Sequence, residues 1–369
     1  MIGGGIAGCA ACLGLARRGV EVAWIAPSSP IADKPGESLA PAALAVLENL
    51  GIDDLLADPA HRKSMVSFTA WGRDTLVERH AAGQPGGMGH VINRGHFETA
   101  LVERVRQTAG IVRVDGSLAT FSRGDAGWAL KADSGQVINA SMLIDATGRL
   151  AMIGRTQTSL RRIDRLVAAY AFLKQTDLDI DPTPATLIEA VEGGWWYATL
   201  LANRQLALNF YSDPDLMPRK IGKSLGLWQQ MVGRTRYIAR WIESAGYEIS
   251  EPPGLASAGT VWLENAAEAD WLAVGDAAVS FDPLSAHGMT TALWTGNEAA
   301  EAATLALTGD GAALESYAAR LRLGVEQYDR ERQQIYAREM RFSHHPFWQR
   351  RQKADSPPRL VTASDTSIR

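Results

Sequence analysis

A glycine-rich turn near the N-terminus limits how this chain can fold more than any other feature. The turn is Gly3-Gly4-Gly5-Ile6-Ala7-Gly8, which has G-x-G-x-x-G spacing, and residues 9–18 after it have the pattern of a helix. In a β-α-β unit the first glycine of this pattern makes the turn, the second lets the backbone approach a pyrophosphate, and the third lets the helix pack on its strand. We therefore expect a dinucleotide site at a helix N-terminus, formed by Gly3, Gly5, Ile6, Ala7 and Gly8.

The second strand of this unit lacks one expected residue. Residues 20–26 read as a buried strand, and an acid that binds ribose hydroxyls normally stands at its end, where this chain has Ala26. Ser28 and Ser29 follow and are possible substitutes for that acid. Only Met1 and Ile2 precede the turn, so we expect a shortened first strand and a few natural N-terminal residues absent from this numbering.

Residues 1–16 are uncharged and resemble the apolar part of a secretion signal. No basic segment precedes them, however, and their glycines disfavour a hydrophobic helix. No other window reaches the roughly 18 apolar residues of a membrane span. The net charge of −4 and the pI near 6.0 give no basic excess for nucleic acid. We expect a cytoplasmic protein with neither a membrane span nor a nucleic-acid partner.

The only cysteines are Cys9 and Cys12, both in the predicted first helix. Two cysteines cannot build a disulfide scaffold or a multi-cysteine zinc module, and we expect no metal site. A redox pair is one interpretation of this spacing. We favour the other, in which small side chains let the helix pack closely on the sheet.

Two later segments contain the glycine turns and the acidic side chain that a nucleotide-binding site commonly uses. Residues 143–149 form an apolar strand that ends in a turn with Gly148. Residues 271–278 contain Gly275 and Asp276, whose carboxylate can accept a sugar-alcohol hydroxyl or cap a helix. Pro283, Gly288 and Met289 follow, and the positive end of the long helix predicted from Leu284 suits an anionic group.

These three motifs, in this order, resemble the FAD-dependent monooxygenase superfamily of the glutathione-reductase fold. The segment with Arg94, Phe97 and Leu101 is similar to the R-x-x-F-x-x-x-L segment of that superfamily, whose arginine lies near the flavin. The resemblance covers the chain to about Arg351 and implies FAD as the cofactor, with Arg94 beside it.

The resemblance also implies an α/β fold in which a β-sheet substrate domain is inserted into a discontinuous Rossmann-like FAD-binding domain. Residues 163–211, rich in aromatic and β-branched side chains, fit that inserted sheet. The expected division is residues 1–62, 90–162 and 256–310 for FAD, 63–89 and 163–255 for substrate, 311–352 for C-terminal helices and 353–369 for a poorly ordered tail.

Three shorter segments narrow the resemblance. Residues 34–39 (KPGESL), 194–197 (GWWY) and 282–285 (DPLS) are similar to the halogenase-related flavoproteins that mature peptide-derived quinone cofactors, of the QhpG, LodB and GoxB type. This similarity implies hydroxylation of a tryptophan in a partner polypeptide, towards cysteine tryptophylquinone. It implies O2 as co-substrate, a flavin C4a-hydroperoxide as oxygen donor, and NADH, NADPH or a separate reductase as electron source.

The same resemblance suggests roles for individual side chains. Glu37 and Ser38 are expected to flank the flavin and His287 to lie at its pyrimidine side, as catalytic residues. Trp195, Trp196 and Tyr197 are expected to line the aromatic substrate pocket, although a double tryptophan also suits sheet packing. Glu37 as a cap of the helix predicted over 39–50, and His287 as a loop hydrogen-bonding residue, are the structural alternatives.

Halogenation is the competing activity, and the sequence disfavours it. Halogenases carry G-W-x-W-x-I-P, which residues 194–200 break, and Ser285 stands in place of their glutamate. The strand at 68–71 contains no lysine to serve as their catalytic lysine. A prenyl-type reductase acting on a small molecule and a non-catalytic flavoprotein assembly factor remain alternatives.

Overall fold

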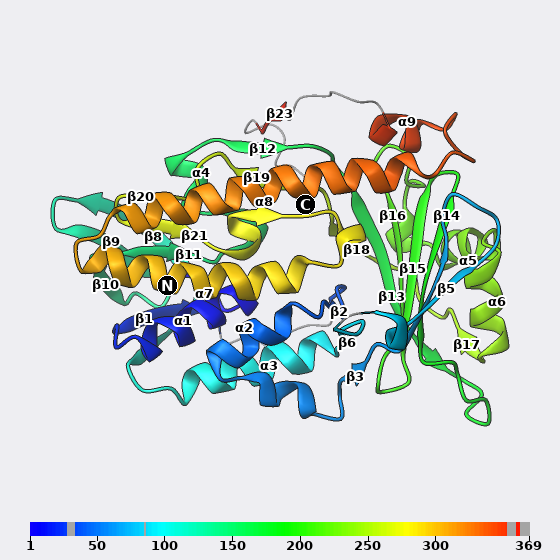
Figure 1. The fold of residues 1–369 in the computed structure, drawn as a ribbon, viewed down its shortest axis with the longest axis horizontal. Helices are drawn as coiled ribbons and strands as arrows, with labels where there is room; N and C mark the ends of the chain where they lie inside the picture. Colours follow the sequence, from blue (N-terminus) through cyan, green and yellow to red (C-terminus); the bar gives the residue numbers. More distant parts are fainter. Residues whose placement is uncertain (28–33, 85, 353–358, 362–369) are drawn as a thin grey trace.

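The computed structural model describes residues 1–27, 34–84, 86–352 and 359–361, and shows two halves that share a long C-terminal helix (Figure 1). Ser28 and Ser29, the predicted substitutes for the ribose-binding acid, lie outside the described residues. None of the helices in these ranges has both the length and the apolar character needed to cross a membrane.

A mostly parallel sheet forms the first half. Strand β1 (Val22–Ala26) pairs with β7 (Ile111–Asp115), and β11 (Leu143–Asp145) pairs with β21 (Trp271–Ala273), both in parallel. The edge strand β20 (Ala267–Glu268) is antiparallel to β21. An outer antiparallel layer contains β8 (Leu118–Gly124), β9 (Gly127–Ala132) and β10 (Val137–Ala140).

The first strand of the glycine unit is as short as expected. Ile2 bridges Ile25 on one side and Asp145 on the other, so it joins the two parallel pairs into one sheet. The amino group of Met1 donates a hydrogen bond to the Ala23 carbonyl at 2.9 Å. Burial lowers the pKa of this amino group, because a charge is costly between two strands.

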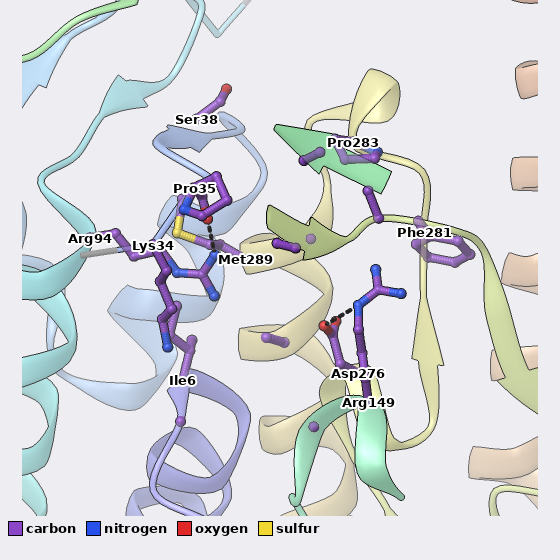
Figure 2. A pocket seen from close by; sticks show the side chains of 18 of the residues that line it. Ile6, Lys34, Pro35, Ser38, Arg94, Arg149, Asp276, Phe281, Pro283 and Met289 are labelled. Carbon is purple, nitrogen blue, oxygen red and sulfur yellow. Dashed lines mark hydrogen bonds and ion pairs between the residues drawn. The ribbon is translucent and has the colours of Figure 1, made fainter. Parts of the chain in front are cut away.

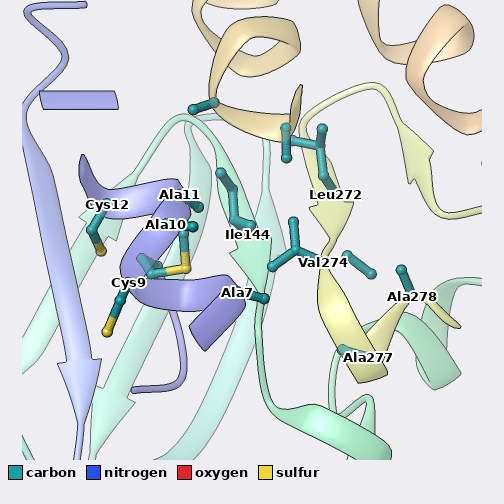
Figure 3. Packing of buried hydrophobic residues seen from close by; sticks show 14 of the residues in the cluster. Ala7, Cys9, Ala10, Ala11, Cys12, Ile144, Leu272, Val274, Ala277 and Ala278 are labelled. Atoms are coloured by element: carbon teal, nitrogen blue, oxygen red, sulfur yellow. The ribbon is translucent and has the colours of Figure 1, made fainter. Parts of the chain in front are cut away.

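Helix α1 (Ile6–Arg17) begins directly after the glycine turn and packs against α7 (Gly288–Leu307). A Cβ at Gly296 of α7 would lie 2.5 Å from the Ala7 carbonyl oxygen, so only glycine permits this approach. Cys9 and Cys12, on another side of α1 from Ala10 and Ala11, are buried in the same hydrophobic core (Figure 3). Burial raises the pKa of Cys12 to about 12, as expected for packing residues rather than a redox pair.

Two predicted helices begin later than the pattern indicates. Helix α2 is Ala43–Leu50, and Ser38–Leu39 instead form β2, paired with β6 (His90–Val91). Pro41 explains the difference, because it disfavours helical geometry at the preceding residue. Helix α7 was expected from Leu284 but begins at Gly288, after a 3-10 turn at Pro283–Ser285. The other helices near this sheet are α3 (Arg94–Arg106) and α4 (Gly154–Gln157).

A larger, mainly antiparallel sheet forms the second half. Its strand order is β17-β13-β16-β15-β14-β4-β5, with β18 also paired to β13. The strands are β4 (Val66–Ala70), β5 (Val77–His80), β13 (Val167–Gln175), β14 (Ala185–Val191), β15 (Gly194–Leu200), β16 (Leu206–Ser212), β17 (Tyr247–Glu248) and β18 (Gly254–Ser257). Helices α5 (Leu225–Gly233) and α6 (Tyr237–Ser244) cover one face (Figure 1).

The C-terminal helices hold the two halves together. Helix α8 (Ala312–Ala337) runs beside α7, and α9 (Pro346–Gln352) lies on the other face of the large sheet (Figure 1). A small sheet joins β12 (Leu160–Arg162), β19 (Val261–Leu263) and β22 (Val279–Ser280), while β3 (Arg62–Lys63) pairs with β6. Arg359–Leu360, expected in the tail, form β23 against β12.

Candidate functional site

A cavity of about 480 Å³ lies where the two halves meet. The glycine turn, loop 34–38 and the start of α7 line it from the first half, and strands of the large sheet line it from the second. Figure 2 shows Lys34, Arg94 and Ile6 on one side of the cavity, with Arg149, Asp276 and Phe281 across from them. The cavity therefore brings together most of the separate motifs that the sequence singles out.

The glycine turn forms a cradle at one end of the cavity. A Cβ on Gly5 would meet no atom within 4 Å, so its backbone faces open space. Gly3 has φ +113°, and a Cβ there would lie 2.1 Å from the Ala146 oxygen, while one on Gly8 would lie 2.3 Å from the Gly3 oxygen. Helix α1 has no side-chain cap and no acid in its first turn, which suits a bound anion.

The start of α7 lies on the same cavity. Pro283, Gly288 and Met289 line it, and Gly288 also has open space where a Cβ would stand. Gly275, with φ +56°, lets the preceding loop approach Ala7 of α1. Two helix N-termini therefore open towards one cavity.

Asp276 and Gly148 line the cavity between these ends. The Asp276 carboxylate lies 3.5 Å from Nε of Arg149, and both side chains are partly exposed (Figure 2). Asp276 stands inside a short 3-10 helix whose N-cap is Val274, so the capping interpretation is wrong. Its carboxylate is placed to accept hydrogen bonds from a ligand.

Arg94 fastens loop 34–38 to α3. One guanidinium nitrogen donates to the Pro35 carbonyl at 2.5 Å, and Nε lies 2.8 Å from the buried Glu98 carboxylate. Lys34 reaches the other Glu98 oxygen at 2.7 Å. This network fixes the loop that carries Glu37 and Ser38, both of which line the cavity.

Glu37 is the buried carboxyl group of this loop. Its side chain is 2% exposed, and neither carboxylate oxygen has a hydrogen-bond partner. Burial raises its pKa to about 7, although the nearby backbone amides of Glu37 and Gly36, and then Arg94, pull the pKa down. Helix α2 begins at Ala43 without a side-chain cap, so Glu37 does not cap it.

Strand β15 divides its aromatic residues between two faces of the sheet. Trp195 and Tyr197 line the cavity, whereas Trp196 packs against Phe210 and Trp228 beneath α5. The prediction that Trp196 lines the pocket is therefore wrong, because neighbouring side chains of a strand point to opposite faces. The packing alternative holds for this one tryptophan.

Tyr211 is a cavity residue that the sequence analysis missed. Its ring stacks on Trp195 with 4.0 Å between centroids and 24° between planes. The two residues are directly opposite on β15 and β16. Their shared strand pattern was visible in the sequence, but the register that makes them neighbours was not. Other lining residues that were not predicted as site residues include Lys34, Glu98, Arg149, Ala168 and 256–258.

His287 lies away from the cavity lining. It is exposed, forms the N-cap of α7, and its backbone amide donates to Ser285 Oγ at 3.4 Å. The structure thus brings Glu37 and Ser38 together but places His287 outside, as in the structural alternative. Among the described residues, no three side chains of His, Cys, Asp or Glu form a metal-binding group.

Asp145, at the end of β11, is buried beside the same site, but its carboxylate has an environment different from that of the Glu37 carboxylate. One carboxylate oxygen accepts hydrogen bonds from the amide and hydroxyl of Thr147, at 3.0 and 2.6 Å. The other accepts from the amides of Ile153 and Gly154, at 2.9 and 3.0 Å. Asp145 thereby shapes the loop that presents Gly148 to the cavity.

Comparisons with known proteins agree with this architecture. The profile of the tryptophan halogenase family matches residues 87–366. The chain is 26% identical over 275 residues to LodB of Marinomonas mediterranea, assigned as an FAD-dependent oxidoreductase, with 72% of each chain covered.

Solved structures show the same fold at lower identity. The peptidyl tryptophan dihydroxylase QhpG, essential for tryptophylquinone cofactor biogenesis, has a TM-score of 0.77 at 23% identity, covering 95% of this chain and 77% of its own. The flavin-dependent halogenase CmlS has a TM-score of 0.82 at 21% identity, covering 96% and 67%. The myxobacterial chondrochloren halogenase CndH has 0.83 at 17%, covering 96% and 85%. The cavity, the fold and the profile match together show that the chain belongs to the tryptophan halogenase family of flavin-dependent oxidoreductases.

Proposed function

We propose that the protein is an FAD-dependent monooxygenase that hydroxylates an aromatic ring, most specifically a tryptophan of a partner polypeptide during quinone cofactor biogenesis. The observation that carries this proposal is that the glycine cradle and the aromatic residues Trp195, Tyr197 and Tyr211 line one and the same cavity. An aromatic substrate held by the sheet would lie beside a dinucleotide held by the cradle.

The residues present fit FAD. Gly5, Ile6 and Ala7 would hold the pyrophosphate, because the uncapped α1 amides and the open space at Gly5 favour a phosphate there. Asp276 would accept ribityl hydroxyls. Further contacts would come from Gly3, Gly8, Ser38, Arg94, Gly148, Gly275, Pro283, Gly288 and Met289.

Bound FAD would supply two-electron chemistry with O2, fed by NADH, NADPH or a separate reductase. The chain itself would position the ring and exclude water, which is the main requirement when the indole carbon is already electron-rich. The stacked pair of Trp195 and Tyr211 gives a rigid apolar surface for this purpose.

Hydroxylation fits the ionisable groups of the cavity better than halogenation does. Lys34 is the only lysine among the described lining residues, and its ammonium group pairs with Glu98. Strand β4 has no lysine. Halogenation nevertheless stays the second candidate, because the family profile and the folds of CmlS and CndH point to it.

The test is co-expression with small Trp- and Cys-rich proteins encoded nearby, followed by intact-mass measurement and fragmentation of each. One or two added oxygen atoms on a tryptophan are the expected result, and the same gain must disappear in Gly5→Asp, whose carboxylate would oppose a phosphate. Added chlorine or bromine would establish halogenation instead. Two added hydrogens would indicate a reductase, and no change with FAD bound would contradict the polypeptide substrate.

A further inference from the structure

We propose that Glu37 accepts a hydrogen bond from the ring N–H of an indole substrate, so that this carboxylate selects indole and orients it in the cavity. The inference rests on the proposed function only in taking an aromatic ring as the substrate. It assigns to Glu37 a contact with substrate rather than a place beside the cofactor.

The first argument is the unused hydrogen-bonding capacity of Glu37. Both of its oxygens are buried and have no hydrogen-bond partner, and Glu37 is among the residues that line the cavity, so a small rotation of the side chain would present an oxygen to a ligand. A buried acceptor without a donor is costly, so a donor supplied by a ligand would be bound favourably. The nearest guanidinium, that of Arg94, is directed to Pro35 and Glu98 instead.

The second argument comes from the other acids of the cavity. Glu98 is occupied by Arg94 and Lys34, and Asp276 is paired with Arg149. Glu37 is therefore the one carboxyl group among the described lining residues that has no partner. An N–H donor that enters this cavity meets a free carboxyl acceptor only there.

The third argument is the surroundings of Glu37. The groups that face it are the backbone amides of its own loop, at Gly36 and Glu37, with Arg94 from α3, Tyr197 from β15 and Tyr211 from β16. Burial keeps the pKa of both tyrosines above the usual range, so neither is ionised near neutral pH. An aromatic surface beside a lone carboxyl group matches indole, which has an apolar ring and one donor.

The chemical consequence follows from the charge of the acceptor. A carboxylate that accepts a hydrogen bond from the indole N–H polarises the N–H bond and thereby raises the electron density of the ring. Because the pKa of Glu37 is about 7, the carboxylate fraction rises strongly between pH 6 and pH 8. Binding of an N–H donor should therefore tighten over this range.

The experiment compares indole with 1-methylindole, which has the same ring but no N–H donor. Both are titrated into the FAD-loaded protein at pH 6 and pH 8, and the flavin absorbance reports binding. For the wild type we expect indole to bind about five- to tenfold more tightly at pH 8, since hydrogen bonds to charged groups are the stronger ones. The affinity for 1-methylindole should change less than twofold.

Glu37→Gln should abolish the pH dependence of indole binding, and Glu37→Asp, which keeps a carboxyl group, should retain part of it. Bound FAD in each variant verifies the fold. Equal pH dependence for the two ligands, pH-dependent indole binding in Glu37→Gln, or no binding of indole at either pH would overturn the inference. Oxygen added on co-expression would still support the hydroxylase even then, so the two proposals can fail separately.

Discussion

Among the buried carboxyl groups near the cavity, Asp145 at the end of β11 and Glu37 in loop 34–38 have opposite environments. Asp145 accepts four hydrogen bonds, whereas Glu37 accepts none. Both are almost completely inaccessible to solvent. Burial alone therefore does not distinguish a structural acid from a functional one, and the number of donors around each oxygen does.

The largest effect is expected for Asp145→Asn. The amide keeps the shape of the carboxylate but places an NH2 group against protein donors, leaving them unsatisfied. The free energy of unfolding should fall by about 3–5 kcal/mol, the scale for disrupting a buried charged group that is fully hydrogen-bonded. Guanidinium denaturation would measure this loss. A loss below about 1 kcal/mol would contradict the view that Asp145 is a structural acid and differs in this from Glu37.

Glu37→Gln should raise the free energy of unfolding near neutral pH, the opposite of the effect expected for Asp145→Asn. The folded-state pKa of about 7 lies above the ordinary value of 4.5, so folding opposes ionisation and the wild type loses stability as pH rises from about 4.5 to 7. Gln cannot ionise. The difference in unfolding free energy between the variant and the wild type should therefore shift by about 3 kcal/mol in favour of the variant as the pH rises from 4 to 8. A pH-independent difference, measured by denaturation at both pH values, would contradict the raised pKa.

Glu98→Gln tests an intermediate case. Glu98 is buried, but its partners Arg94 and Lys34 are partly exposed, so solvent screens much of the attraction. A loss of about 1–2 kcal/mol in unfolding free energy is expected. Weaker FAD binding should accompany it, measured by flavin titration, because loop 34–38 loses its anchor. Unchanged FAD affinity would show that the loop holds its position without this network.

The smallest effect is expected for His287→Gln. The side chain is exposed and outside the cavity lining, and surface substitutions of this kind usually change stability by less than about 0.5 kcal/mol. The pH dependence of indole binding should remain as in wild type. Loss of that dependence would contradict the assignment of the pH dependence of indole binding to Glu37.

The sequence predicts the glycine cradle well, because each glycine has a backbone reason that spacing alone reveals. Gly3 and Gly8 have no room for a side chain, and Gly5 faces the cavity. The sequence also predicts the packing of Cys9 and Cys12, because small residues on one helix indicate that the helix is closely packed.

What the sequence leaves open is register and pairing. The residues of β15 alternate, but only the partner strands decide that Trp195 faces the cavity and Trp196 the helices. The capacity of Glu37 is equally hidden, since it depends on Arg94 being committed to Pro35 and Glu98. Local pattern gives no information about such distant contacts.

The close packing of α1 on α7 fixes a distance as well as a contact. Both helices begin at the cavity, at Ile6 and Gly288, and Gly296 leaves no room for a side chain where α7 crosses Ala7. The two helices therefore keep a fixed distance between their N-termini. A ligand that contacts both N-termini must match that distance, because the helices cannot slide past each other to admit a longer or shorter one. Because the contacts of Arg94 and Lys34 with Glu98 also hold loop 34–38, a ligand of another length would need a change on the side of the cavity that the large sheet lines.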